Sequence, residues 1–521
     1  MADYFKLITD YTPVESFPSI SGDFFSYSDR VDNYWTGFFN SRPYYKWFDR
    51  YLENWVQATD TLFSIGQLGL ASQSKFRDPD GLYSSIQEAS RTLDLFQHHD
   101  AITGTEKDFV VRDYGDRLTK SMNALQAAFA KIMGELLEVT VTLPVTSSTT
   151  RGALPVENVI QINANSCKYI AVYNSLLHEN EDLVSLRVAG ATAYVATYVD
   201  NDEIIAGQIM PYWQVQNSDS GFNDKLDPAS KKLVLGVCLG GLSTRHVKIC
   251  GQSESTSESL SSSNVLTFNG ASSVAGFETK VGSEHDAVLE GTNLRATLNP
   301  KNGLLRSLKS SEMPNDETQI NLEFRNYGTS QRGDRSGAYL FQPDGPSRPY
   351  FGQESSAQFR IIRGQFVNEV HVLNEKIKHI LTVNSFGLGQ SAVSIDNYFN
   401  IKARDPRTRT GPHPALETKS RTSPIPPFFC FWIFFGKHTG LWTITYDPMF
   451  WISFPEFFKM NKNSGNQIHR TVTQHVFQKK TKNKKWGHLV LFWILFPSPD
   501  VGPSQTVRHG PCIPDERTEQ F

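Results

Sequence analysis

Three long stretches of apolar residues at helical spacing precede residue 140, and beyond that point the apolar pattern becomes alternating. Apolar side chains three or four residues apart share one face of a helix, whereas alternating ones share one face of a strand. The change of period therefore predicts a helical domain followed by sheets, which is the α+β class. A chain of 521 residues is long enough for roughly two to four such domains.

The helical part is predicted to contain three helices with short connections. The first begins near Pro43, because proline is favoured at the first position of a helix, and the third begins at the capping-box-like Thr105-x-x-Asp108. Each helix carries one apolar stripe: Trp47, Tyr51, Trp55 and Leu62 in the first; Leu82, Ile86, Leu93 and Phe96 in the second; Val111, Tyr114, Leu118, Leu125, Phe129, Ile132 and Leu136 in the third. These stripes predict a three-helix bundle that buries them in its core.

The region from about residue 141 to 395 is predicted to consist of strands. Alternating apolar residues bounded by Gly, Asn, Asp and Ser clusters are typical of half-buried strands in a β-sandwich. The predicted strands centre on Ile170 and Val172, on Tyr194–Val199, on Leu233–Leu239, and on Val370 and Val372. The Ser-rich residues 251–263 are predicted to form an exposed loop.

The last hundred residues follow neither pattern. Residues 428–458 are dense in aromatic side chains without a clear period, and a lysine-rich run follows at residues 479–485. We therefore predict an irregular C-terminal tail, with no strand or helix organising it. One hypothesis is that this tail is non-native coding sequence, such as a retained intron or a frameshift.

Charge and hydropathy exclude several classes of partner. The formal net charge of −3 gives no electrostatic case for binding nucleic acid or an anionic membrane. The two most apolar runs, residues 425–435 and 489–496, are far shorter than the roughly 20 residues of a membrane span. No apolar secretory signal opens the sequence as written.

The five cysteines show no metal-ligand or redox spacing. Cys238 and Cys250 are candidates for one disulfide across a short connection, and the redox compartment stays open on this basis.

The tripeptide His98-His99-Asp100 lies between the second and third predicted helices. Imidazole nitrogen is the commonest metal donor in proteins, and a neighbouring carboxylate holds a metal or a sugar hydroxyl. This chemistry suits metal-assisted hydrolysis. The alternative is a polar helix end whose histidines are bonded to backbone. No histidine precedes His98, which argues against a helical phosphohydrolase, because that class needs an earlier helical histidine.

Four ordered segments carry a resemblance to a known family: residues 4–11 (YFKLITDY), 22–30 (GDFFSYSDR), 33–43 (NYWTGFFNSRP) and 97–105 (QHHDAITGT). With these motifs the chain resembles the α-mannosidases of glycoside hydrolase family 38, and most closely their lysosomal type. The similarity is strong over residues 4–135. It is weaker at residues 172–175, 299–304 and 336–341, and a last trace is present at 415–420.

The resemblance implies a division of the chain into domains. Residues 1–22 would be a remnant of the end of a catalytic barrel, and residues 23–140 the central three-helix bundle. Residues 141–240 would form a small β domain and residues 241–400 part of a β-sandwich of the mutarotase-like supersandwich kind. Residues 401–521 would be a tail mostly without family resemblance.

The resemblance also implies a site. In this family a retaining, zinc-dependent mechanism removes terminal α-mannosyl residues from glycans. The second histidine of the His-His-Asp motif is a zinc ligand, which assigns that role to His99. Asp100 would hold mannose hydroxyls, His98 would orient the site without being a ligand, and Tyr339 is a looser match for a further contact to the sugar.

The catalytic groups themselves are not expected in this chain. Retaining hydrolysis needs two carboxyl groups roughly 5 Å apart across the sugar. The family positions for the nucleophile, the acid/base and the other zinc ligands would lie in a barrel that this chain lacks. The resemblance thus implies a lysosomal or secretory α-mannosidase whose sequence as written is a fragment with negligible activity. The alternative from another class is a non-catalytic carbohydrate-binding or partner-binding module, and a helical metal-dependent phosphohydrolase ranks third.

Overall fold

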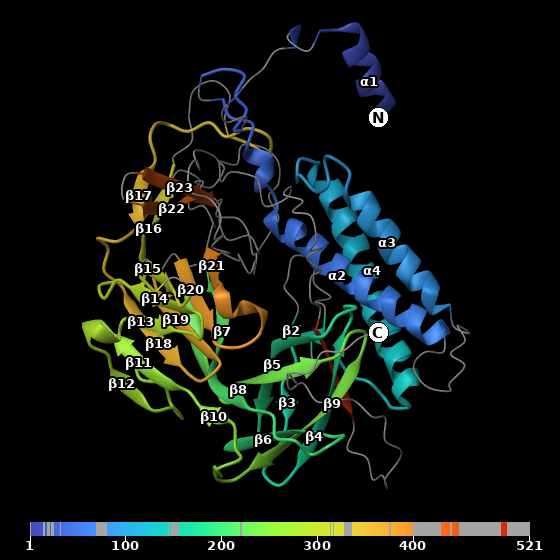
Figure 1. Ribbon diagram of the computed structural model, residues 1–521, viewed down its shortest axis with the longest axis vertical. Helices are drawn as coiled ribbons and strands as arrows, with labels where there is room; N and C mark the ends of the chain where they lie inside the picture. Colours follow the sequence, from blue (N-terminus) through green and yellow to red (C-terminus); the bar gives the residue numbers. More distant parts are fainter. Residues whose placement is uncertain are drawn as a thin grey trace.

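The structure is a computed structural model of the 521-residue chain. It describes residues 2–13, 16–17, 21, 25–31, 33–68, 81–143, 145–146, 156–218, 221–312, 314–315, 317–327, 336–374, 377–399, 429–437, 440–446 and 491–496. Within this part of the chain, helices come first and sheets follow (Figure 1). The α+β class predicted from the change of period is therefore confirmed.

Three long helices pack on one another. They are α2 (Pro43–Leu68), α3 (Leu82–Phe96) and α4 (Asp108–Leu137), and they follow α1 (Ala2–Tyr11) and the short helix η2 (Gly37–Phe39). The predicted start at Pro43 is confirmed. The apolar stripes meet in one core, which includes the fully buried Leu52, Ile86 and Leu118. None of the described helices is both long and apolar enough to cross a membrane.

The start of α4 differs from the prediction. The helix begins at Asp108 with Lys107 as the preceding cap residue, and no side chain caps it. The Thr105 hydroxyl instead donates a hydrogen bond to the Asp100 carboxylate. The capping-box interpretation is therefore wrong, because Thr105 is used to hold the loop that precedes the helix.

Two sheets follow the helices in sequence, after the short pair β1 (Val145–Thr146) and β2 (Val156–Glu157). One has the order β10-β7-β8-β5-β3, with β3 (Ile160–Gln161), β5 (Asn180–Ala189), β7 (Gly207–Ser218), β8 (Gly221–Leu239) and β10 (Ser261–Ser262). The other has the order β24-β4-β9-β6, with β4 (Cys167–Asn174), β6 (Ala193–Tyr198), β9 (Thr244–Gln252) and β24 (Leu491–Phe496). Their inner faces share a core of aliphatic side chains and tyrosines.

Two further sheets pack around a second core. The first has the order β12-β11-β18-β19-β20-β21, with β11 (Asn264–Phe268), β12 (Thr279–Val281), β18 (Gln358–Arg363), β19 (Val367–Leu373), β20 (Ile377–Asn384) and β21 (Val393–Phe399). The second has the order β13-β14-β15-β16-β22-β23, with β17 also on β16. Its strands are β13 (Val288–Glu290), β14 (Leu294–Leu298), β15 (Leu305–Ser310), β16 (Glu317–Asn326), β17 (Arg348–Phe351), β22 (Phe429–Lys437) and β23 (Gly440–Tyr446). The short helices η3 (Glu284–Asp286) and η4 (Leu388–Ser391) lie in connections.

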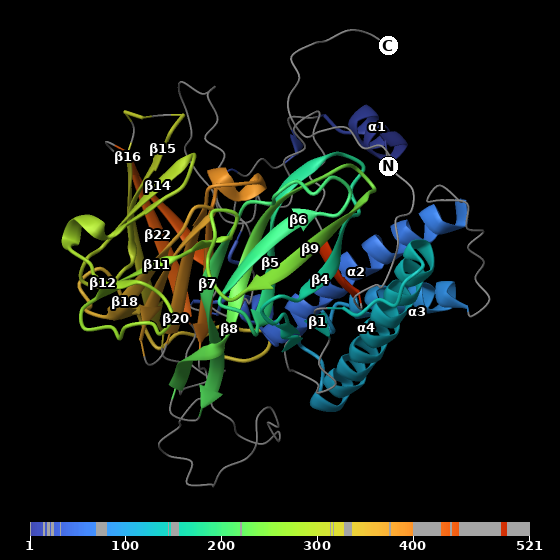
Figure 2. The ribbon, with the colours of Figure 1, turned by 90° about the horizontal axis from the view of Figure 1, so that it is seen from below.

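The helices cover β4 and its neighbours, while the second pair of sheets lies on the far side of β7 and β8 (Figure 2). Tyr173 of β4 is fully buried against the helical core, where its ring lies 6.3 Å from that of Phe129. The strands predicted at Ile170 and Val172, at Tyr194–Val199, at Leu233–Leu239, and at Val370 and Val372 lie in β4, β6, β8 and β19. Those predictions are confirmed, except that β6 ends at Tyr198.

The disulfide differs from the predicted pair. Cys167 on β4 and Cys250 on β9 stand directly opposite each other and are joined, while Cys238 is not part of a disulfide. The Cys238–Cys250 prediction is wrong because sequence proximity does not reveal which residues face each other across a sheet.

The tail also departs from the prediction of irregular structure. Residues 429–437 pair with β16, residues 440–446 pair with 429–437, and residues 491–496 pair with β4. The prediction is wrong for these three strands, because pairing partners far away in sequence organise them. The lysine-rich run at residues 479–485 lies outside the described residues.

Candidate functional site

A tight loop connects α3 to α4 and presents the His-His-Asp tripeptide. The helix α3 ends at Phe96, and the His98 carbonyl then accepts hydrogen bonds from the amides of Ala101 (2.8 Å) and Ile102 (3.2 Å). The Asp100 carbonyl accepts from the amides of Thr105 (3.1 Å) and Glu106 (3.2 Å). These backbone bonds close the loop on itself and fix the direction of the three side chains.

The loop lies against the backbone that precedes α2. Gly104 has a φ of 72°, a conformation that glycine adopts without strain, and a Cβ at this position would collide with the Ser41 carbonyl. No other residue type therefore fits so close to Ser41.

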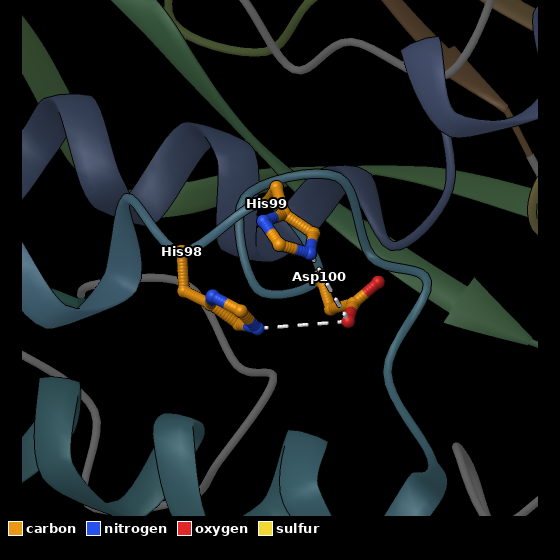
Figure 3. Close-up of side chains that lie close together, drawn as sticks. All are labelled: His98, His99 and Asp100. Atoms are coloured by element: carbon orange, nitrogen blue, oxygen red, sulfur yellow. Dashed lines mark ion pairs between the residues drawn. The ribbon is translucent and has the colours of Figure 1, made fainter.

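His98, His99 and Asp100 turn toward one another (Figure 3). His98 Nε2 lies 3.5 Å and His99 Nε2 lies 3.9 Å from Asp100 Oδ2, and the two imidazole rings are 4.4 Å apart between centroids. The side chain of His99 is 86% exposed, whereas those of His98 and Asp100 are 45% and 37% exposed. The three groups therefore face solvent together, and His99 is the one most open to a further partner.

Two hydroxyl groups approach the other carboxylate oxygen of Asp100. Thr105 Oγ1 donates to Oδ1 at 2.8 Å, and the Tyr339 hydroxyl donates to the same oxygen at 3.4 Å. The Thr105 hydrogen bond lowers the pKa of Asp100 below its ordinary value, and the neighbouring imidazoles add to this effect. Asp100 is therefore a carboxylate that accepts hydrogen bonds at neutral pH.

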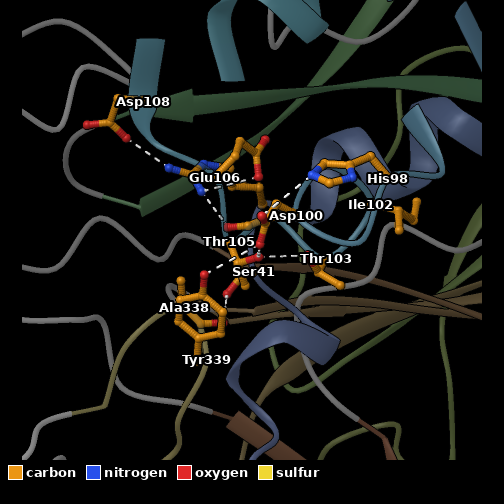
Figure 4. Close-up of polar contacts among 12 residues, drawn as sticks. Ser41, His98, Asp100, Ile102, Thr103, Thr105, Glu106, Asp108, Ala338 and Tyr339 are labelled. Atoms are coloured by element: carbon orange, nitrogen blue, oxygen red, sulfur yellow. Dashed lines mark hydrogen bonds and ion pairs between the residues drawn. The ribbon is translucent and has the colours of Figure 1, made fainter. Parts of the chain in front are cut away.

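Tyr339 reaches the site from residues 336–342, which lie beside η2 (Figure 4). The Gly37 amide donates to the Tyr339 carbonyl at 3.0 Å, and Ser41 Oγ donates to the Ala338 carbonyl at 3.0 Å. A Cβ on Gly37 would collide with the Gly337 carbonyl, so glycine is required for this approach. The backbone of the segment is thereby held beside the helical domain.

Charged side chains also contact the loop between α3 and α4. Arg42 donates to the Gly104 carbonyl and, at 2.8 Å, to the Asp108 carboxylate. Glu106 is buried, and burial raises the pKa of its carboxyl group above the ordinary value. Lys46, which is also buried, donates to the Ile102 carbonyl. Arg42 and Lys46 thus hold the loop at Ile102, Gly104 and Asp108.

The donor set fits a transition-metal cation. Zinc takes imidazole nitrogen and carboxylate oxygen at about 2.0–2.2 Å, so two ligands of one ion lie within about 4.3 Å of each other. The two imidazole–carboxylate distances, 3.5 and 3.9 Å, meet this limit. One donor atom from each of the three residues falls within 4.8 Å of the others. The three side chains are therefore suitable in type for such an ion, and each imidazole–carboxylate pair is also suitable in spacing.

Two segments of the chain match known family models. Residues 33–136 match the α-mannosidase middle domain, and residues 289–421 match the C-terminal domain of the glycosyl hydrolases of family 38. These two segments are similar to the middle and C-terminal domains of the family 38 α-mannosidases. His98, His99 and Asp100 fall in the segment that matches the middle-domain model, and Tyr339 falls in the segment that matches the C-terminal model. The candidate site therefore lies where these two matched segments meet.

Curated relatives are α-mannosidases of greater length. α-Mannosidase 2 of Rattus norvegicus is 31% identical over 432 residues, in an alignment that covers 77% of this chain and 36% of the rat protein. α-Mannosidase 2x of Mus musculus is 32% identical over 434 residues, covering 78% and 36% of the two chains. α-Mannosidase 2 of Homo sapiens is 31% identical over 402 residues, covering 74% and 34%. The chain thus spans about a third of the length of these relatives.

Among solved structures, an α-mannosidase from Enterococcus faecalis V583 is similar. Its sequence is 11% identical, with a TM-score of 0.45, and the match covers 84% of this chain and 47% of the other.

The structure brings together all four residues that the sequence singled out: His98, His99, Asp100 and Tyr339. Their individual roles stay predictions. Sequence reasoning missed Thr105, whose spacing from Asp108 is that of a helix cap, and the support from Ser41 and Arg42. The motif at residues 33–43 includes both, but its function as a link between two loops depends on long-range contacts that no local pattern shows.

Proposed function

We propose that this chain forms part of a retaining, zinc-dependent α-mannosidase that removes terminal α-mannosyl residues from oligosaccharides or glycans. The observation that supports this most is the convergence of Asp100 and Tyr339 beside His98 and His99. This arrangement places a candidate metal ligand next to two groups that suit sugar hydroxyls. The residues come from two segments that match family 38 domains.

In this proposal His99 is the zinc ligand from this chain. Its imidazole is exposed, so it can turn to an ion without breaking a buried hydrogen bond. His98 lies closer to Asp100, where its imidazole orients the carboxylate by a charge-assisted contact. When bound, zinc supplies Lewis acidity toward sugar hydroxyls.

Asp100 and Tyr339 hold the sugar. A carboxylate accepts hydrogen bonds from two vicinal hydroxyls, and a phenol donates one and accepts another. The low pKa of Asp100 keeps it an acceptor in acidic compartments as well as at neutral pH. Tyr339 is half exposed, so its ring edge and hydroxyl are open to a ligand.

The nucleophile, the acid/base and the remaining zinc ligands are proposed to come from polypeptide outside this chain. The two carboxylates that follow the tripeptide do not replace them, because Glu106 is buried and Asp108 pairs with Arg42. We therefore expect negligible hydrolysis by the chain as written.

The finer assignments belong to the same proposal. The helices would be the three-helix bundle of residues 23–140, after a barrel remnant at 1–22. The sheets would be a small β domain at 141–240 and part of a mutarotase-like supersandwich at 241–400, followed by the tail at 401–521. A lysosomal or other secretory location fits the Cys167–Cys250 disulfide, because disulfides persist mainly in oxidising compartments.

The test uses purified chain 1–521 and its His99→Ala, His98→Ala and His285→Ala variants. The control His285 is an exposed histidine in η3, outside the site. We measure zinc affinity by competition with a chromophoric chelator, and hydrolysis of a chromogenic α-mannoside. We expect His99→Ala to weaken zinc binding by at least about tenfold, His98→Ala to weaken it less, and His285→Ala to leave it unchanged.

Two results would overturn parts of the proposal. Equal zinc affinity of the wild-type chain and His99→Ala would remove the ligand role. Hydrolysis that depends on zinc and on His99 would show that this chain supplies its own catalytic carboxyls.

The second candidate is a non-catalytic carbohydrate-binding module. It is favoured by one observation, the Asp100–Tyr339 contact, which needs no metal to form. Binding of an α-mannoside that survives complete zinc removal would support this candidate over the enzyme part.

A further inference from the structure

The dipeptide Ser41-Arg42 touches both halves of the candidate site. Ser41 immediately follows the loop that contains η2, and Arg42 immediately precedes α2. Ser41 contacts the segment that carries Tyr339 (Figure 4). Arg42 contacts the loop that carries Asp100. A change at either residue therefore reaches the two sugar-facing side chains together.

Contacts on the Tyr339 side run along the backbone. Ser41 Oγ donates to the Ala338 carbonyl at 3.0 Å, next to the Gly37–Tyr339 backbone bond. Tyr34 and Phe341 exchange a pair of backbone hydrogen bonds at 3.2 and 2.8 Å, which extends the same contact. The segment is thus aligned with residues 33–41 over several bonds, with Ser41 at their end nearest to the tripeptide.

Contacts on the Asp100 side come from the Arg42 guanidinium. It donates to the Gly104 carbonyl inside the loop and to Asp108 at the start of α4, and its Nη1 lies 3.8 Å from Glu106. Arg42 therefore contacts three positions from Gly104 in the loop to Asp108, the first residue of α4. Bonds between a charged donor and a carbonyl or carboxylate in a half-buried place are among the stronger ones in proteins.

The backbone conformation of Arg42 is one that surrounding contacts must hold in place. Its φ is 52°, in the left-handed region that residues other than glycine rarely adopt. Such a conformation is strained for a residue with a side chain and persists only where surrounding contacts hold it. The contacts of Ser41 and Arg42 with the two loops supply that restraint.

We propose that Ser41 and Arg42 are positioning residues that set the distance between Asp100 and Tyr339. The inference rests on the proposed function in one respect, that these two side chains hold hydroxyls of the same sugar. Neither Ser41 nor Arg42 touches the ligand in this scheme. They act by keeping one loop of the middle domain and one loop of the C-terminal domain in register.

The first experiment needs no ligand. 3-Fluorotyrosine is incorporated at position 339 alone, and the displacement of its ¹⁹F resonance by Asp100→Asn reports the contact between the two side chains. This displacement is compared in the wild-type chain, Arg42→Ala, Arg42→Lys, Ser41→Ala and the control Arg117→Ala. Arg117 also pairs with a carboxylate, Asp113, but on the exposed surface of α4.

We expect Asp100→Asn to displace the resonance in the wild-type chain and in Arg117→Ala. The displacement should vanish in Arg42→Ala, decrease in Ser41→Ala, and partly return in Arg42→Lys, which keeps the charge but not the planar fork. A merely structural loss would not be restored by the conservative variant. An unchanged displacement in Arg42→Ala and Ser41→Ala would overturn the inference, as would the lack of any displacement in the wild-type chain.

The second experiment measures affinity for methyl α-mannoside in the same variants. Because Arg42→Ala loses the contact, it should bind methyl α-mannoside at least about threefold more weakly than the wild-type chain. The affinity of the control Arg117→Ala should equal that of the wild type. A wild-type chain that shows the ¹⁹F coupling but does not bind the sugar would contradict the proposed function while supporting the positioning role. Wild-type binding that Arg42→Ala leaves intact would contradict the positioning role alone.

Discussion

The Thr105 hydroxyl donates a 2.8 Å hydrogen bond to the carboxylate of Asp100, five residues earlier in the same loop. The hydroxyl of Thr103 lies 2.8 Å from that of Thr105, so a short chain of hydroxyl groups leads to the carboxylate. Because a hydrogen bond to the charged form favours ionisation, this contact is the main cause of the low pKa of Asp100.

The variant Thr105→Val removes the hydroxyl at nearly constant volume, and we expect the pKa of Asp100 to rise. A carboxyl group whose folded-state pKa is lowered adds stability above its unfolded pKa, and this contribution is lost as the pH falls through the folded value. Thr105→Val should therefore also be less stable than the wild-type chain at neutral pH. The measurement is a carbon-detected NMR titration of the Asp100 carboxyl.

The matched control is Thr119→Val. Thr119 lies in α4, where its hydroxyl donates to the Gly115 carbonyl, so the same chemical change is made away from the tripeptide. A titration of Asp100 that is the same in wild type, Thr105→Val and Thr119→Val would show that the hydroxyl does not set its pKa.

Local patterns predicted the parts of the fold that depend on one segment at a time. The stripe through Trp55 predicted α2, and alternation at Val370 and Val372 predicted β19. Both predictions were possible because the spacing of apolar residues within one segment determines which of its faces is buried. The strand at residues 429–437 was missed because an uninterrupted apolar run does not distinguish strand from helix, and its partner β16 lies about a hundred residues away.

In the candidate site, too, the residues could be predicted but their contacts could not. Family resemblance singled out Asp100 and Tyr339, but not the 3.4 Å contact between them. That contact depends on Gly37, Ser41 and Arg42. Each of these residues binds a backbone carbonyl in a distant loop, that of Tyr339, Ala338 or Gly104 respectively. No spacing rule along one chain reports such contacts, and the same limit applies to the pairing of Cys167 with Cys250.

Removing the Cys167–Cys250 disulfide is expected to destabilise the sheet of β4 and β9. The bond closes a connection of 83 residues, and in the chain-entropy model a cross-link restricts the unfolded state more as that connection lengthens. The double variant Cys167→Ser/Cys250→Ser should lose about 2–4 kcal/mol of unfolding free energy, measured by urea denaturation followed by circular dichroism. Cys238→Ser, which removes a thiol outside the disulfide, should change little. Equal losses in the two proteins would argue against a stabilising role for the bond.

Gln208 joins the two pairs of sheets, and its truncation is expected to weaken that junction. Its fully buried side chain accepts hydrogen bonds from the amides of Phe366 and Val367, both at 2.9 Å, and donates to the Val367 carbonyl and to Ser263. Gln208→Ala would leave these buried groups unpaired. This should lower the unfolding free energy by about 1–3 kcal/mol. Thermal and urea unfolding measure the loss.

The control for Gln208 is Gln358→Ala on β18. Gln358 also donates to a backbone carbonyl, that of Gly270, but in an exposed position where water replaces the bond. A change within about 0.5 kcal/mol is expected for this variant. If both glutamine variants unfolded at the same urea concentration as the wild type, the junction would not depend on Gln208.

His379 is expected to make the protein less stable in acid. Its imidazole is fully buried on β20, Nδ1 lies 2.7 Å from Asn397 Oδ1, and its ring meets that of Phe324 edge-on. Burial lowers the pKa of His379 from 6.5 to about 4. Between these pH values the unfolded chain binds a proton that the folded one excludes, so stability falls as the pH falls, by on the order of 1 kcal/mol per pH unit.

The variant His379→Asn tests this, because the amide nitrogen replaces Nδ1 toward Asn397 without a group that titrates in this range. Urea unfolding at several pH values from 7 to 4 should give a shallower loss of stability for His379→Asn than for the wild type. His285→Asn removes an exposed imidazole and should keep the wild-type slope. Parallel pH profiles for the wild type and His379→Asn would mean that the buried imidazole is protonated without cost, which its contacts with Phe324 and Asn397 argue against.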